Sequence, residues 1–269
     1  MRYVLSAVLA VVMMAAAPAY PHGGNRWQGE VSVEVVSDRG TTLLTIPYKD
    51  LWKGSTRTIK KFLEAKQGET YSIVIRNLTP GRIGVVVAVD GRNIISSKRS
   101  ELRNTEDMYL VNGYDQGRYD GWRTNQDTVH KFYFTDPGDS YSSRTFNDAS
   151  AMGVIAVAVY REKDRPQLQD EMRKQENAPA APSAGSAERS KSLSSRDEAA
   201  GTGFGERQYS PAVRVAFEPE LTPVQKTLVK YDWREVLCKK GLLNCGEVIG
   251  NRLWDENGYA PYPPEHRGN

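Results

Sequence analysis

Apolar and polar residues alternate along two stretches in the first half of the chain. In "EVSVEVVS" and "ETYSIVIRN" almost every second residue is apolar, which is the two-residue period of a strand with one buried face. The apolar positions are Val31, Val33 and Val35 in the first stretch and Tyr71, Ile73 and Ile75 in the second. The alternation predicts two half-buried strands.

Three further stretches carry strand signals. "RIGVVVAVDGRNII" is a long apolar run interrupted by Asp90-Gly91, a pair that favours a tight primed hairpin turn because glycine tolerates positive φ. "HKFYFTD" alternates Phe132 and Phe134 with Tyr133. "GVIAVAVYRE" is apolar on both faces, which indicates a central strand of a sheet.

Short strand-like stretches separated by Gly, Asn, Asp and Pro favour a mainly β fold, either a β-sandwich or an open barrel. We expect a β-sandwich of the jelly-roll or immunoglobulin-like kind over residues 28–162. The longest helix candidate, "RPQLQDEMRKQE", is polar all round, which indicates a helix on a linker rather than a core element.

The composition changes after this region. Residues 163–206 are rich in Pro, Ala and Ser and bury too little apolar area to offset the cost of ordering, so we interpret them as a flexible linker. A small tethered α+β element is expected over residues 207–258, followed by a flexible tail at 259–269.

The C-terminal element contains two strand-like stretches, "SPAVRVAFEP" and "KTLVKYD". "DWREVLCKKGLLN" predicts a short helix, capped by Asp232 and ending near Gly241. The sequence leaves open whether this element docks on the sandwich.

The N-terminus has the pattern of a secretory signal peptide. Arg2 precedes a short apolar run, and the small residues around Ala19 predict removal of residues 1–19. No other stretch is long and apolar enough to cross a membrane, so we expect a soluble periplasmic or extracellular protein. The formal net charge of +3 falls to about +2 without Arg2, which gives no electrostatic reason to expect nucleic acid as a partner.

The chain has two cysteines, Cys238 and Cys245. In an oxidising compartment, an isolated near pair predicts a disulfide that closes a small loop. A redox couple usually has the tighter C-x-x-C spacing, and a zinc site would need more soft ligands than the chain offers nearby.

The order of segments resembles a widespread family of uncharacterised exported bacterial proteins. The resemblance rests on "KFLEAKQGETYSIVIRN", "IGVVVAVDGRNII", "DGWR", "FYFTDPGDSYSSRT", "GVIAVAVY", "GTGFGERQYSP" and "VAFEPE", and it covers most of residues 62–220. It implies a secreted β-sandwich with a tethered second piece. It brings no assigned catalytic residues, and the cysteine pair and the aromatic tail depart from it.

The three histidines offer no convincing metal site. If residues 1–19 are removed, His22 stands third in the chain, where copper or nickel binding needs the amide nitrogen of the second residue. That residue is Pro21, which has no N–H to lose. His130 lies beside an apolar strand, where a packed or surface histidine is the usual outcome, and His266 lies in the tail.

Nucleophile and phosphate motifs are missing as well. There is no G-x-S-x-G turn, and hydroxyls in "DPGDSYSS" are typical turn formers. "GTGFGE" lacks the spacing and the Lys-Ser/Thr of a phosphate-binding loop, so we interpret it as a flexible hinge. We expect no cofactor.

The stretch "GYDQGRYDGWR" gathers more competent side chains than any other. Asp115 and Asp120 lie in loops, where hard oxygen ligands can bind calcium. Their spacing matches no calcium loop, and we favour turn-forming, paired acids instead. The candidate ligand-binding residues are Tyr114, Asp115, Tyr119, Asp120, Trp122 and Arg123.

The aromatic residues of this stretch have two interpretations. Trp122 and the tyrosines could stack on a sugar ring, since they combine a flat apolar face with a polar edge. The alternative, which we favour, is that Trp122 folds into the sandwich and holds the loop.

These observations favour an exported, non-enzymatic binding or assembly protein of the cell envelope, whose strand edges could accept another chain. The alternative is a carbohydrate-binding or polysaccharide-processing protein that uses the loop around Trp122. The expected partner is accordingly a protein or a glycan of the envelope.

Overall fold

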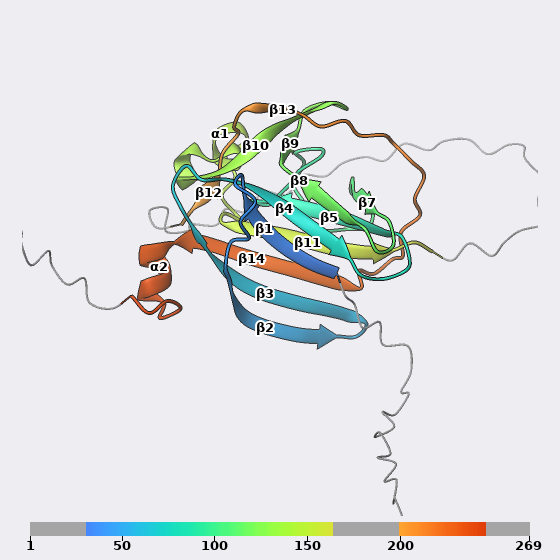
Figure 1. Ribbon diagram of the computed structural model, residues 1–269, viewed down its shortest axis with the longest axis horizontal. Coiled ribbons are helices and arrows are strands. Elements are labelled where there is room, and N and C mark those ends of the chain that lie inside the picture. The colour runs from blue at the N-terminus through green and yellow to red at the C-terminus, as the bar shows by residue number, and fades with distance from the viewer. Residues whose placement is uncertain (1–30, 164–198, 246–269) are drawn as a thin grey trace, which may run out of the picture.

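Two β-sheets packed face to face make up the described part of the protein (Figure 1). The computed structural model describes residues 31–163 and 199–245, and within them each sheet has seven strands and the helices are short. The predicted mainly β sandwich is confirmed. The predicted signal peptide, most of the predicted linker and the predicted tail lie outside the described residues.

The first sheet has the order β1-β4-β10-β12, with β8 paired to β4 and with β9 and β13 paired to β10. Its strands are β1 (Val31–Ser37), β4 (Thr70–Asn77), β8 (Gln116–Tyr119), β9 (Gly121–Arg123), β10 (Thr128–Thr135), β12 (Gly201–Thr202) and β13 (Arg207–Tyr209). All of its strand pairs are antiparallel.

The second sheet has the order β2-β3-β14-β11-β5-β6, with β7 paired to β5. Its strands are β2 (Thr45–Lys53), β3 (Thr56–Ala65), β5 (Ile83–Val89), β6 (Arg92–Asn93), β7 (Tyr109–Val111), β11 (Val154–Arg161) and β14 (Gln225–Trp233). β3 and β14 are parallel, and the other pairs are antiparallel. The helices are η1 (Pro137–Asp139), α1 (Tyr141–Phe146) and α2 (Arg234–Lys239).

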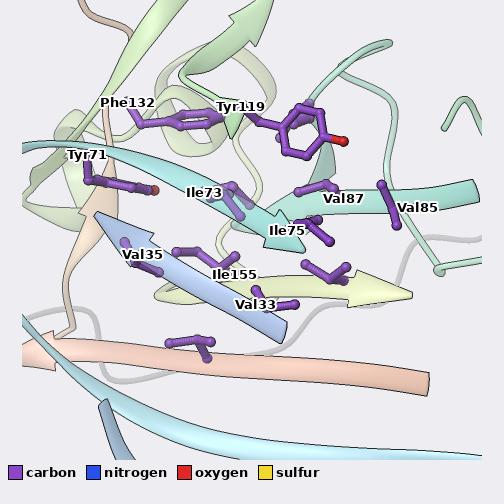
Figure 2. Packing of buried hydrophobic residues seen from close by; sticks show 14 of the residues in the cluster. Val33, Val35, Tyr71, Ile73, Ile75, Val85, Val87, Tyr119, Phe132 and Ile155 are labelled. Atoms are coloured by element: carbon purple, nitrogen blue, oxygen red, sulfur yellow. The ribbon is translucent and has the colours of Figure 1, made fainter. Parts of the chain in front are cut away.

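The inner faces of the two sheets form one continuous core, and Figure 2 shows β1 and β4 facing β5 and β11. The predicted half-buried strand is confirmed for β1, whose Val31, Val33 and Val35 are at most 4% exposed. It is wrong for β4, because Ser72 and Val74 on the opposite face are also buried, at 1% and 7% exposed. The predicted central position of β11 between β5 and β14 is also confirmed. Aromatic rings fill one end of the core, where Tyr71 stacks on Phe132 and Phe134 at centroid distances of 5.3 and 4.3 Å.

The predicted turn between β5 and β6 is present. Asp90 and Gly91 have φ angles of 47° and 77°, the pair of positive values that a primed hairpin turn requires.

The position of β14 shows whether the C-terminal element docks on the sandwich, which the sequence leaves open. It lies between β3 and β11 in the middle of the second sheet, with Val229 and Tyr231 in the core. The described part of this element therefore belongs to the sandwich rather than to a separate tethered unit. "KTLVKYD" is the predicted strand, whereas the strand predicted for "SPAVRVAFEP" is wrong, because residues 210–219 have a single isolated bridge, Glu162 to Pro219.

The end of the predicted linker is also corrected. Gly201 and Thr202 pair with β10, and "GTGFGE" runs along that strand instead of forming a flexible hinge. The N–H groups of Gly203 and Gly205 donate to the carbonyl oxygens of Tyr133 and Lys131 at 2.8 and 2.9 Å. Glycine is needed for this approach, since a Cβ at Gly203 would overlap the Tyr133 ring.

The predicted helix near the C-terminus is α2, but its predicted cap is wrong. Asp232 lies in β14, is 1% exposed and accepts a hydrogen bond from Lys240 at 2.6 Å, while Trp233 occupies the cap position. Cys238 and Cys245 lie at disulfide-bonding distance, with Cα atoms 5.6 Å apart. No helix within the described ranges is long and apolar enough to cross a membrane.

A buried carboxylate joins the chain segments on either side of the predicted linker. Asp90 is 1% exposed, and its Oδ1 accepts hydrogen bonds from the Gly153 N–H at 2.7 Å and the Tyr231 hydroxyl at 2.6 Å. Its Oδ2 accepts from the Thr202 N–H at 2.7 Å. Because each partner comes from a different segment, one carboxylate fixes the positions of β5, β11, β12 and β14 relative to each other.

The network continues through hydroxyl groups, and its direction follows from the number of protons. Tyr231 gives its one proton to Asp90, so Thr202 Oγ1, 2.6 Å away, must donate to Tyr231. Tyr71, 2.7 Å from Thr202 Oγ1, then donates to Thr202. The chain of donors therefore runs from β4 of the first sheet to β5 of the second.

Burial raises the pKa of Asp90 from 3.8 to about 6, although the three donated hydrogen bonds act in the opposite direction. The folded protein therefore binds this proton more tightly than the unfolded chain. The resulting stabilisation is complete below the unfolded value and is lost as the pH rises through about 6.

We predict that Asp90→Asn removes this pH dependence. The free energy of unfolding of the wild type, relative to the variant, should fall by about 2 kcal/mol between pH 4 and pH 7, because a shift of one pKa unit is worth about 1.4 kcal/mol and part of the effect lies below pH 4. Urea unfolding across this range measures the difference, with the exposed Asp127→Asn as the control. A difference that rises with pH would contradict the assignment.

Candidate functional site

The stretch 113–123 does not form one pocket. It enters the first sheet as β8, paired with β4, and continues as β9, paired with β10. Because side chains alternate across a sheet, these two short strands send their residues to different surroundings.

Trp122 is fully buried. Its indole N–H donates to the Gly203 carbonyl at 3.0 Å, and its ring meets Phe132 edge-on at a centroid distance of 5.3 Å. The indole ties β9 to Gly203, which lies near the end of the predicted linker of residues 163–206. It has no exposed face on which a sugar could stack, so the geometry supports the interpretation of Trp122 as an anchor.

The carboxylates of the two acids of the stretch accept hydrogen bonds from groups within the fold. Asp115 is exposed, and its carboxylate accepts from the Gln116 N–H at 2.8 Å. Asp120 accepts from Ser72, Arg118 and Gln208 at distances of 2.7 to 3.1 Å. Within the described residues there is no cluster of three His, Cys, Asp or Glu side chains able to hold a metal ion.

The other predicted residues separate into two groups. Tyr114 is 74% exposed and has a φ of 58°, so it projects from a turn. Tyr119, Asp120 and Arg123 line a groove, whereas Tyr114, Asp115 and Trp122 do not. The structure thus brings half of the predicted set to one surface.

This groove has a volume of about 1010 Å³. One side is formed by residues 104–126, and the other by residues 210–219, which we call the strap. Figure 1 shows the strap as the extended orange segment after β13, lying outside the two sheets. The groove lining is mixed, with Met108, Leu110 and Phe217 beside charged residues such as Arg118 and Glu106.

The strap is fixed at its first end by backbone groups. The N–H groups of Ser210 and Ala212 donate to the carbonyls of Asp127 and Gln126 at 2.9 and 2.8 Å. Arg123 reinforces this end, because its Nη1 donates to the Ser210 carbonyl at 2.8 Å. Arg123 therefore serves as a positioning residue for the strap.

Phe217 fixes the second end. Its ring lies against Gly84 of β5, where a Cβ would come within 2.6 Å of Phe217 and 2.5 Å of the Met108 sulfur. The Arg82 guanidinium lies 5.5 Å from the centre of the ring. The seat for the strap therefore depends on the absence of a side chain at Gly84.

Between the two ends the strap is open. No hydrogen bond to a described residue is formed by the backbone N–H groups of residues 213–216. Val213 is 86% exposed and Val215 59% exposed. The middle of the strap therefore lies beside the groove, and its backbone N–H groups are available to a partner.

Two tyrosines form part of the groove floor. The rings of Tyr109 and Tyr119 lie 4.5 Å apart, and Arg123 Nε donates to the Tyr109 hydroxyl at 2.7 Å. The Tyr119 hydroxyl is buried and has no hydrogen-bond partner among the described residues, and Figure 2 shows it pointing away from Tyr71 and Phe132. Burial raises the pKa of both phenols, so both stay neutral donors.

The strap is the part of the site that sequence reasoning missed. The strand-like composition of "SPAVRVAFEP" predicts a paired strand, and the sequence gives no signal that the fold leaves this segment unpaired. His130, by contrast, is packed as expected, with Nδ1 2.9 Å from the Gly205 carbonyl and the ring stacked on Phe204.

Comparisons with family models, curated proteins and solved structures gave no match for this chain. The resemblance to exported bacterial proteins therefore stays a prediction.

Trp122→Ala should destabilise the protein by about 3–5 kcal/mol, because it leaves a large cavity in a packed core. It also leaves the Gly203 carbonyl without its donor. Urea unfolding measures the loss, and Trp52→Ala, at a position 41% exposed, is the matched control with a much smaller expected loss. Equal losses for the two variants would contradict the anchor role.

Gly84→Ala should loosen the second end of the strap, since the new methyl group displaces Phe217. We expect faster trypsin cleavage after the exposed Arg214, identified by mass spectrometry. Gly81→Ala is the control, because a Cβ there meets no atom within 4 Å. Unchanged cleavage in Gly84→Ala would show that Phe217 does not hold the strap.

Proposed function

We propose that this protein is an exported, non-enzymatic binding module of the cell envelope. Its groove takes an extended segment of a partner protein, which pairs with the open part of the strap. The proposal rests mainly on the backbone N–H groups of residues 213–216, which form no hydrogen bond with a described residue.

An extended partner suits these groups, because β-strand addition uses main-chain hydrogen bonds for affinity and side-chain pockets for specificity. The strap is fixed at both ends and its middle is already extended, so little ordering is needed on binding. The tyrosine pair and several charged residues line the groove beside the strap, and we expect the charged residues to contact side chains of the added segment.

The groove itself also favours a peptide over a small metabolite. Its volume lies at the upper limit of typical small-molecule sites, and its lining mixes apolar with charged side chains. The glycan-binding alternative has weaker support, because the aromatic residue on which it was based, Trp122, is buried.

Export rests on the N-terminal pattern of residues 1–19 and on the cysteine pair at bonding distance. Both support a periplasmic or extracellular location, where envelope proteins are the available partners.

Proline substitutions in the strap test the proposal. Successive N–H groups of an extended chain point to opposite edges, so Arg214→Pro or Val215→Pro removes a donor that faces the groove. A photo-crosslinking amino acid at Ala216 reports the partner in living cells, and mass spectrometry identifies the attached segment. We expect one of the two proline variants to lose most of the crosslinked product.

Arg214→Ala and Val215→Ala are the matched controls, because they change the same side chains and keep the N–H groups. Crosslinking that survives both proline substitutions would contradict strand addition. Crosslinking that is lost equally in the alanine variants would assign recognition to the side chains instead.

A further inference from the structure

A second surface lies at the opposite end of the second sheet from the groove. β2 forms the edge of this sheet and lies at the bottom of Figure 1. Leu63 and Ala65 of β3 face the core, so the alternating positions Thr58, Lys60 and Phe62 face outward. The register of β3 with its neighbours extends this outward face over β2 and β14.

Lysines dominate the charge of this outward face, because its two acids, Glu64 and Asp232, are paired with Arg234 and Lys240 at 3.1 and 2.6 Å. The other outward positions are Ile46, Tyr48, Lys49, Leu51 and Lys53 on β2, Thr56, Thr58, Lys60 and Phe62 on β3, and Lys226, Leu228 and Lys230 on β14. Lys230 lies 3.7 Å from Asp232. The other four lysines form no ion pair with a described residue, so their charge is available to a partner. We call this surface the lysine face.

The lysine face also exposes apolar groups near the sheet edge. Tyr48 and Leu51 are each 52% exposed. The Tyr48 ring packs edge-on against Phe62 at 5.2 Å, and Lys49 Nζ lies 5.0 Å from its centre. An aromatic and an aliphatic side chain therefore project among cations.

A second copy of the chain does not suit this face. Two like faces bring lysines against lysines, and charged residues on an edge strand oppose edge-to-edge pairing. Pro47 and the irregular register beside it weaken the edge further as a pairing site. The positive charge of the lysines favours an anionic partner. The exposed side chains of Tyr48 and Leu51 favour a partner with an apolar interior.

We propose that the lysine face docks on an anionic lipid bilayer. The lysines meet the headgroups, while Tyr48 and Leu51 enter the boundary between headgroups and acyl chains. Lysine side chains suit this position because their stems can cover apolar surface while the charge stays in water. The proposal is independent of the strap, which lies at the other end of the sheet.

Vesicle cosedimentation tests the proposal, with the purified exported protein, residues 20–269. We expect binding to vesicles of phosphatidylcholine and phosphatidylglycerol in equal parts, weakened by salt, and none to phosphatidylcholine alone. Lys49→Gln with Lys60→Gln should weaken binding about 25-fold, since each lysine near an anionic bilayer contributes about 1 kcal/mol. Arg39→Gln, in the turn after β1, combined with Arg207→Gln, in β13, is the charge-matched control and should bind normally.

Tyr48→Ser with Leu51→Ser separates a bilayer from a soluble polyanion. This variant keeps every lysine and should lose at least about tenfold in vesicle binding. Binding that is insensitive to it, and is displaced by dextran sulfate, would make the face a polyanion site and overturn the proposal. The proposal is also overturned if anionic vesicles are not bound, or if the control variant loses as much binding as the lysine variant. Thermal melting confirms that each variant is folded.

Discussion

The fold depends on one buried carboxylate. Asp90 accepts hydrogen bonds from Tyr231 of β14 and from the backbone N–H groups of Gly153, just before β11, and Thr202, in β12. The Thr202 hydroxyl extends the network to Tyr71 in the other sheet. A buried charge is costly unless it is hydrogen-bonded, so these donors must all be present together. The network thereby makes the segments before and after the predicted linker parts of one structure, although they are far apart in the sequence.

The position of the strap is a consequence of this arrangement. Thr202 is fixed beside β10 in the first sheet, and Gln225 begins β14 in the middle of the second. The chain between them has to cross from one sheet to the other, and the interior is already filled by the core. It therefore passes outside the sandwich, held by Arg123 at one end and seated on Gly84 at the other. A groove beside an unpaired extended segment results from this crossing.

Local patterns predicted part of the sandwich, namely β1, β4, β5, β10, β11 and β14, because each pattern depends on neighbours in the sequence. The apolar inner positions of β1 and β4, the turn at Asp90-Gly91 and the burial of Trp122 were readable in this way. β2, β3, β8 and β9 were not predicted, because their residues do not show the two-residue alternation. The central position of β14 in the second sheet could not be predicted from local patterns, because its pairing with β3 joins residues that are distant in the chain. "GTGFGE" was misread for the same reason: its glycines indicate flexibility alone, whereas contact with Tyr133 makes them sites of close packing. The strap could not be found from its own residues, because its strand-like sequence gives no sign that a partner strand is missing.

The two proposed surfaces use opposite ends of one sheet. The lysine face lies over β2, β3 and β14, and the strap is seated beside β5 and β7, with β11 between them. A hydrogen-bonded sheet is stiff along this direction, so the distance between the two surfaces is fixed by the strand order. A bilayer in contact with Tyr48 and Leu51 leaves the groove at the far end of the sheet, open to a second protein. Taken together, the two proposals give the sandwich the role of holding an extended segment of a partner at a set position from the membrane, which neither proposed surface would achieve alone.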